Sequence, residues 1–160
     1  MNMDKYVIRM ALEKDKARIL EIYAYARNFM AANGNPNQWK NNNPSKEVID
    51  EDISAGNLYV IEETGTETLD GIKKGADNEN SIVHGVFFFK IGEDPTYKVI
   101  ERGSWLSDDI YGTIHRVAGD GRVHGVLAMA VQFCEQSINH LRIDTPVSYT
   151  HLTLPTILLV

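Results

Sequence analysis

Residues 111–134, YGTIHRVAGDGRVHGVLAMAVQFC, constrain the fold of this chain more than any other stretch. The segment opens with a β-prone run that ends near Ala118, and a turn containing Gly119 and Gly121 follows. Apolar residues then recur at helical spacing, which predicts a helix over residues 122–137. A strand that enters a helix through glycines leaves the first helical N–H groups without partners inside the helix.

These N–H donors and the positive end of the helix dipole predict a site for a phosphate or pyrophosphate. Gly125 lets a ligand approach the backbone closely, and Arg122 can add a full positive charge. The alternative is that Gly119 and Gly121 only form a tight turn and that Gly125 only eases helix packing. The residues by themselves leave both interpretations open.

Two better-known phosphate-binding motifs are excluded. A Walker-type loop requires a Gly-Lys pair, and the sequence contains none. The dinucleotide fingerprint G-x-G-x-x-G also fails, because His124 stands where the third glycine would fall after Gly119 and Gly121.

The order of predicted elements indicates an α+β domain, with α/β character, built on a mixed sheet. Strands are expected at residues 6–11, 57–63, 81–91 and 111–118 and from residue 141, and helices at residues 15–33, 45–53 and 122–137. This order is β-α-α-β-β-β-α-β, without internal repeats. A chain of 160 residues is long enough for one domain.

Composition narrows the class of protein further. The formal net charge of −6 provides no basic field for nucleic acid, so we expect no nucleic-acid partner. The single cysteine, Cys134, allows no internal disulfide, and the N-terminus lacks the pattern of a signal peptide. No apolar run is long enough to cross a membrane. We therefore expect a cytoplasmic protein that does not interact with membranes.

The hexapeptide Arg122-Val-His-Gly125-Val-Leu127 resembles the acetyl-CoA signature of the GNAT superfamily of N-acetyltransferases, Gln/Arg-x-x-Gly-x-Gly/Ala. Arg122 and Gly125 match this pattern, whereas Leu127 departs from it at the last small position. Further similarity lies in Ile8-Arg9-x-Ala11, the Gln38-Trp39 loop, Leu58-Tyr-Val-Ile-Glu and Arg142-Ile-Asp-Thr. The resemblance covers residues 6–145, and the element order is the GNAT order, with a mostly antiparallel sheet flanked by helices.

The resemblance implies that residues 1–145 form a GNAT-like domain with acetyl-CoA as co-substrate. The acceptor would be a primary amine on a small molecule or peptide, which would attack the thioester directly. The strand at residues 114–118 would pair with pantetheine, and the backbone of residues 123–127 would hold the pyrophosphate. The implied cofactor-binding residues are Ile114, Arg116, Val117, Ala118, Arg122, Val123, His124, Gly125, Val126 and Leu127. A non-catalytic sensor of CoA esters and a plain α+β domain are the alternatives, and a homodimer is left open.

Candidate catalytic residues follow from the same resemblance. His115 lies in the strand that would face acetyl-CoA and could relay the proton of the amine, since imidazole titrates near neutral pH. Strand alternation predicts that one of His115 and Arg116 points into the cleft. Glu62 ends a strand where some GNAT enzymes place a base. The alternatives are structural: His115 could be a hydrogen-bonded histidine, and Glu62 could lie at a solvated strand end.

Candidate acceptor-binding residues are Trp39 and Tyr97, two aromatic residues in predicted loops that could instead cover the sheet. His84 is interpreted as a packed residue and Cys134 as a small core residue. The five histidines show no metal-ligand spacing, so we expect no metal site.

The final residues, 146–160, contain no Asp, Glu, Lys or Arg. Residues 147–156 resemble one reading frame of the transposase adapter used in sequencing-library preparation. We therefore expect an artefactual tail at 146–160 and a domain that lacks its C-terminal helix and two strands. A genuine, divergent strand is the alternative. An incomplete domain leaves an inactive truncated fragment as a further functional alternative.

Overall fold

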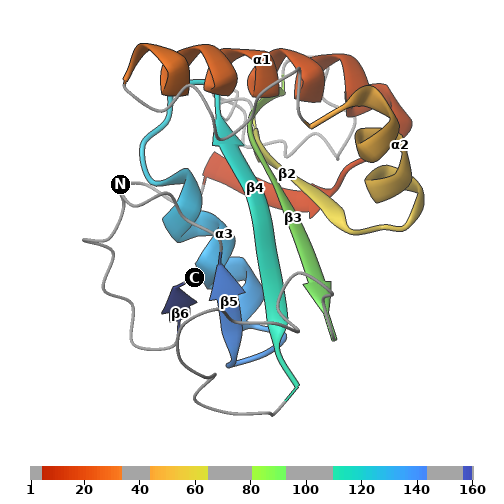
Figure 1. Cartoon of the computed structure of the whole chain (residues 1–160), viewed down its shortest axis with the longest axis vertical. Coiled ribbons are helices and arrows are strands. Elements are labelled where there is room, and N and C mark those ends of the chain that lie inside the picture. The colour runs from red at the N-terminus through yellow and green to blue at the C-terminus, as the bar shows by residue number, and fades with distance from the viewer. Residues whose placement is uncertain (1–4, 34–43, 65–80, 93–109, 144–156, 160) are drawn as a thin grey trace, which may run out of the picture.

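A computed structural model describes residues 5–33, 44–64, 81–92, 110–143 and 157–159 (Figure 1). Six strands form one sheet in the order β1-β2-β3-β4-β5-β6. The strands are β1 (Tyr6–Met10), β2 (Leu58–Glu63), β3 (Ile82–Ile91), β4 (Gly112–Gly119), β5 (Leu141–Ile143) and β6 (Ile157–Leu159). The helices are the 3-10 turn η2 (Glu13–Asp15), α1 (Lys16–Ala32), α2 (Lys46–Ser54) and α3 (Val126–Glu135).

The sheet is mixed and mostly antiparallel, which confirms the predicted fold class. β1 to β4 pair antiparallel in sequence order, whereas β5 runs parallel to β4 and β6 runs parallel to β5. The predicted element order holds as far as β5. β6 lies inside residues 146–160 and is an addition to that order.

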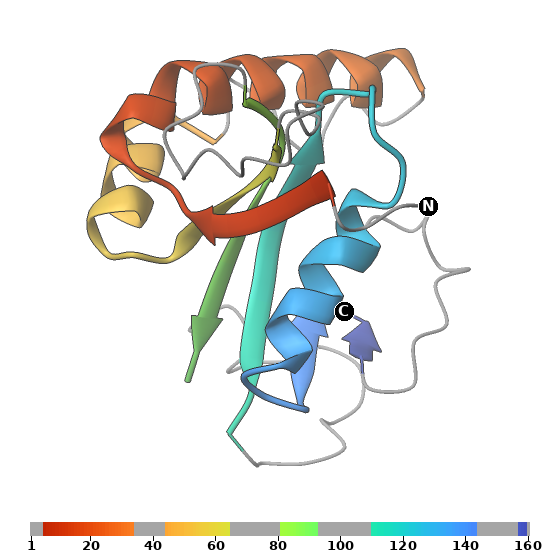
Figure 2. The same ribbon diagram turned by 180° about the vertical axis from the view of Figure 1, so that it is seen from behind.

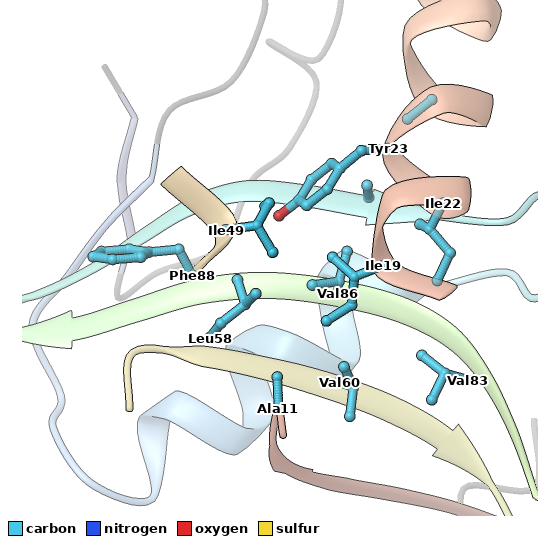
Figure 3. Close-up of a cluster of buried hydrophobic side chains, with 12 residues drawn as sticks. Ala11, Ile19, Ile22, Tyr23, Ile49, Leu58, Val60, Val83, Val86 and Phe88 are labelled. Atoms are coloured by element: carbon cyan, nitrogen blue, oxygen red, sulfur yellow. The ribbon is translucent and has the colours of Figure 1, made fainter. Parts of the chain in front are cut away.

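Helices cover both faces of the sheet, as Figures 1 and 2 show from opposite sides. α1 and α2 pack on one face through a buried cluster that includes Ile19, Tyr23, Ile49 and Phe88 (Figure 3). α3 packs on the other face, where Met129 and Cys134 join a second buried cluster. The two apolar stripes of α1 and α3 explain this layering, because each must be buried against one side of the sheet.

The starts of α2 and α3 differ in how well the sequence predicts them. Ser45 caps α2 as expected, since its side chain accepts a hydrogen bond from the Val48 N–H at 3.3 Å. The predicted start of the last helix at Arg122 is wrong, because α3 begins at Val126. Gly125 precedes it with φ 80°, a left-handed conformation that interrupts helical geometry and that glycine adopts without strain.

In the described part of the chain, no helix has the length and apolar character needed to span a membrane. The same residues contain no group of three or more His, Cys, Asp or Glu side chains arranged to hold a metal ion.

Candidate functional site

The described pairing of β4 with β5 covers three residue pairs at the start of β4. Gly112, Thr113 and Ile114 pair with β5, and the pairing ends there although β4 continues to Gly119. Among the described residues, no strand pairs with the β5 side of β4 from His115 onward. This stretch of strand edge presents backbone groups that an extended, amide-containing ligand can pair with.

A β-bulge interrupts β4 just after the last of these pairs. Phe88 of β3 pairs with His115, and Val86 pairs with Ala118, so one residue of β3 faces both Arg116 and Val117. Arg116 has φ 48° and is the only non-glycine residue with positive φ among those described. Such a conformation costs roughly 1–3 kcal/mol and persists only where neighbouring contacts impose it.

The bulge brings two consecutive side chains to the same aromatic ring. The His115 ring lies 5.7 Å from the Phe88 ring between centroids, and the Arg116 guanidinium carbon lies 4.9 Å from the centre of the same ring. Strand alternation, which predicts that only one of the pair faces this side, is therefore wrong at this position. Because Phe88 belongs to the cluster under α1 and α2, both residues lie on that face of the sheet.

Residues from α1 and α2 hold Arg116. The Tyr23 hydroxyl donates to the Arg116 carbonyl oxygen at 2.9 Å, and Asp52 forms an ion pair with the Arg116 guanidinium. Burial raises the pKa of Tyr23 far above its usual range, so the hydroxyl remains a donor. Burial also raises the pKa of Asp52, against the Arg116 charge, which lowers it.

The sequence analysis does not identify Tyr23 or Asp52, because each looks like an ordinary helix residue. Only the tertiary structure brings them to β4.

The loop between β4 and α3 contains the residues that are predicted to hold a phosphate. Gly121 and Gly125 have φ values of 81° and 80°, and the Asp120 carboxylate accepts a hydrogen bond from the Arg122 N–H at 2.9 Å. The N–H groups of the first turn of α3 have no partner within the helix. Arg122 and His124 are exposed on this loop, with Val123, Val126 and Leu127 half-buried. The predicted phosphate site therefore lies on a loop that leads into α3, and not on the first turn of a longer helix.

The two candidate catalytic residues are not brought together. Glu62 pairs with Val83 in the sheet and His115 pairs with Phe88, five residues further along β3. At ~3.3 Å per residue, the two positions lie roughly 17 Å apart along the strand. His115 is nearly fully buried beside the bulge.

Glu62 instead takes part in a charge network around an open cleft of about 320 Å³ between the start of α1, the end of β2 and the start of β3. Its carboxylate accepts from Arg9 at 3.1 Å and from the Ser81 hydroxyl at 2.7 Å. Burial raises its pKa, but these two hydrogen bonds outweigh that effect and lower the pKa overall. A carboxylate engaged in this way is a poor proton acceptor, so the structure argues against Glu62 as the base.

His84 is buried, as the sequence analysis expects, but it is also part of a polar chain across three elements. Its Nδ1 lies 2.6 Å from Asp120, and its Nε2 lies 2.8 Å from Glu63. Arg18 of α1 donates to the same Asp120 carboxylate at 2.7 Å. These polar contacts connect the start of the β4–α3 loop to α1, β2 and β3.

Trp39 and Tyr97, the predicted acceptor-binding residues, lie outside the described residues. Thr113 is the remaining polar side chain of β4 on the His115 side. It is fully buried, and its hydroxyl has no hydrogen-bond partner among the described residues.

Solved structures share this arrangement of elements. A GNAT-family acetyltransferase from Streptococcus agalactiae is 24% identical to the chain, with a TM-score of 0.69 over 91% of this chain and 80% of that one. A GNAT-family acetyltransferase from Listeria monocytogenes is 14% identical, with a TM-score of 0.58 over 86% and 75%. The chain has the GNAT fold. No protein-family model and no curated protein matches the sequence.

Proposed function

We propose that this chain is an N-acetyltransferase that moves an acetyl group from acetyl-CoA to a primary amine. The observation that carries the proposal is the course of β4. This strand lacks a strand partner on one side from His115 onward, among the described residues, and then runs through two left-handed glycines to the start of α3. A strand edge without a partner among the described residues, leading to a predicted anion site, suits a ligand made of amides and a pyrophosphate.

The chain offers donors of the right kind at both ends of this path. The backbone of residues 114–118 would pair with the pantetheine amides. The N–H groups of residues 123–127 would hold the pyrophosphate, assisted by the exposed guanidinium of Arg122. Of these five donors, those of Val126 and Leu127 belong to the helix and the others belong to the loop. Bound acetyl-CoA supplies an acetyl group activated as a thioester.

His115 is the residue that we propose accepts the proton of the attacking amine. Attack forms the N–C bond and breaks the C–S bond, and the proton that His115 accepts then passes to the departing thiolate, which restores the neutral imidazole. Backbone N–H groups at the bulge would polarise the acetyl carbonyl. Cys134 takes no part, since it is buried against the sheet and burial raises its pKa to about 12. Direct transfer therefore needs no acyl-enzyme.

The acceptor would approach on the side of the sheet where His115 lies. Trp39 and Tyr97 remain our candidates for framing it, and a small-molecule or peptide amine is the class that fits the proposed chemistry.

A sensor of CoA esters is the second candidate. One observation favours it: the carboxylate beside the β4 bulge, Asp52, and that of the predicted base, Glu62, are both held in ion pairs with arginines. A non-catalytic protein would bind acetyl-CoA by the same backbone groups without turnover.

Calorimetry with CoA and acetyl-CoA tests the binding step, and release of free thiol across a panel of amines tests transfer. We expect binding of both ligands and turnover with at least one amine. His115→Gln should lower kcat about 100-fold or more without changing CoA affinity, whereas the control His140→Gln should turn over normally. Binding without transfer to any amine would favour the sensor, and absence of binding would exclude both proposals.

A further inference from the structure

Arg116 is the most constrained backbone position in the described part of β4. Among the described residues, it is the one non-glycine residue with φ in the left-handed region, and it lies at the centre of the bulge. An arginine has no intrinsic preference for this conformation, so contacts outside the strand must select it. The contacts that the structure shows come from three different elements.

We propose that Tyr23 and Asp52 are positioning residues that hold the β4 bulge in its reactive conformation. This inference rests on the proposed transferase function. Tyr23 acts on the backbone, because its hydroxyl donates to the Arg116 carbonyl oxygen at 2.9 Å. Asp52 acts on the side chain through its ion pair with the guanidinium. Phe88 supports the same guanidinium from β3, at 4.9 Å from its ring centre.

These contacts act on different parts of one residue and so determine its orientation together. Fixing the carbonyl oxygen sets the peptide plane between Arg116 and Val117, and fixing the guanidinium sets the direction of the side chain. Because α1 supplies Tyr23 and α2 supplies Asp52, a shift of either helix would be transmitted to β4. Tyr23 is fully buried, and the Asp52 side chain is 13% exposed, so neither contact competes strongly with water.

The contacts of Tyr23, Asp52 and Phe88 with Arg116, here called the Arg116 clamp, also affect the proposed catalytic residue. His115 immediately precedes Arg116, and its ring packs on the same Phe88 ring. A change in the Arg116 dihedral would therefore redirect the His115 side chain and the backbone N–H groups that follow it. A displacement of about 1 Å at reacting groups can lower a rate by about 100-fold.

The alternative is that the ion pair between Asp52 and Arg116 only stabilises the fold. The variant Arg116→Gly distinguishes this alternative from the proposed positioning role. Glycine adopts positive φ without strain, so Arg116→Gly retains the bulge while removing the side-chain half of the clamp. Arg116→Ala removes the same contacts but keeps the conformational penalty. If the clamp serves to impose the bulge, the glycine variant should outperform the alanine variant, although it has fewer side-chain atoms and a more flexible unfolded chain.

The test compares Asp52→Asn, Tyr23→Phe, Arg116→Ala and Arg116→Gly in the full chain. Asp50→Asn is the matched control, because Asp50 lies on the same helix and pairs with Lys16 rather than with β4. Amide hydrogen exchange of residues 115–118 reports on the bulge, calorimetry reports the CoA dissociation constant, and steady-state kinetics separates kcat from KM.

We expect faster exchange at residues 115–118 and a fall in kcat of about 10- to 100-fold in Asp52→Asn, Tyr23→Phe and Arg116→Ala. KM for the amine should change by less than about threefold, since binding of the acceptor is not the step that is lost. Arg116→Gly should recover at least about tenfold in kcat relative to Arg116→Ala, and adding Asp52→Asn to it should have no further effect.

Wild-type exchange rates in Asp52→Asn and Tyr23→Phe would overturn the clamp. Equal losses of kcat in Arg116→Gly and Arg116→Ala would also overturn it, because relief of the backbone strain at position 116 would then not restore kcat. Failure of the proposed function looks different. The wild-type chain would bind no CoA, while hydrogen exchange would still show whether the clamp holds the bulge.

Discussion

A Cβ atom on Gly119, the last residue of β4, would lie 3.1 Å from Cγ2 of Val126, the first residue of α3. Gly85 pairs with Gly119 across β3 and β4, and a Cβ there would lie 3.0 Å from Cγ1 of the same valine. Val126 therefore rests on two glycines of adjacent strands. Their missing side chains set how closely the start of α3 approaches the end of β4.

Gly119→Ala should destabilise the protein and weaken CoA binding together. Gly119 has no positive φ, so the added methyl group acts only by its volume. Overpacking of this kind costs about 1–3 kcal/mol, and it would lift the helix N-terminus away from the strand. Urea unfolding and calorimetry measure the two effects. The double variant Gly119→Ala, Val126→Ala should recover much of both losses, and no recovery would contradict the packing explanation.

Gly125→Asn should lower CoA affinity with little loss of stability. Asn tolerates the left-handed conformation that Gly125 adopts, so the substitution adds a side chain at the proposed pyrophosphate site without breaking the loop. Gly125→Val is a less informative variant, because a β-branched residue is strained at φ 80° whether or not a ligand is present. We expect an increase in dissociation constant of at least about tenfold, measured by calorimetry.

Unchanged affinity in Gly125→Asn, with an unchanged unfolding midpoint, would remove Gly125 from the proposed site. Gly56→Asn is the matched control, since Gly56 also has a left-handed φ of 71° but lies between α2 and β2.

The Arg9 network should make stability depend on pH in the acid range. Arg9 donates to Asp15 at 2.7 Å and to Glu62 at 3.1 Å. Burial raises the pKa of Asp15 and Glu62, but hydrogen bonds from Arg9 and from other donors lower both pKa values below their ordinary 3.8 and 4.5. A lowered carboxylate pKa adds stability above the ordinary value, and that stability is lost as pH falls through the lower, folded-state value.

Arg9→Met should therefore cost about 2 kcal/mol at neutral pH and flatten the loss of stability below about pH 4.5. Urea unfolding as a function of pH measures both effects. Lys5→Met is the control, because Lys5 joins the same two strands through an exposed pair with Glu63 and should change little. Parallel pH profiles for wild type and Arg9→Met would show that the network does not titrate in this window.

Cys134 should be unreactive in the folded protein. The side chain is completely buried, and burial raises the pKa of its thiol to about 12, so almost no thiolate is present at mildly alkaline pH. Reaction with a chromogenic disulfide should be slow in native buffer and complete in concentrated guanidinium. Cys134→Ala should keep kcat within about twofold of wild type, and a large loss of kcat without loss of stability would contradict direct transfer.

The sequence was sufficient to predict most elements of the fold. Hydrophobic periodicity identified the strands that became β1 to β5 and both α1 and α2, and Ser45 correctly marked the start of α2. These features are local, because side-chain spacing and capping depend on neighbours within a few residues. The start of α3 was misplaced because Arg122 is compatible with a helix. The left-handed conformation of Gly125 prevents α3 from beginning before Val126. A glycine permits this conformation but does not require it.

The candidate site was predictable only in part. The glycine-containing loop after β4 could be recognised from its residues, and its place in the fold follows from the order of elements. The separation of His115 from Glu62 was not predictable, since it depends on the register of β2 and β4 against β3. A shift of register alters which residues are neighbours without changing any local pattern.

By itself, then, the sequence determined the layers of this protein and the segment that leads from β4 to α3, because both follow from patterns of apolar residues and glycines along the chain. The tertiary structure decided the conformation of Arg116. Its positive φ, and the placement of His115 and Arg116 against one phenylalanine, arise from contacts with Tyr23 and Asp52, which are 93 and 64 residues away in the chain. No local preference encodes that geometry, because it is imposed by packing between distant elements.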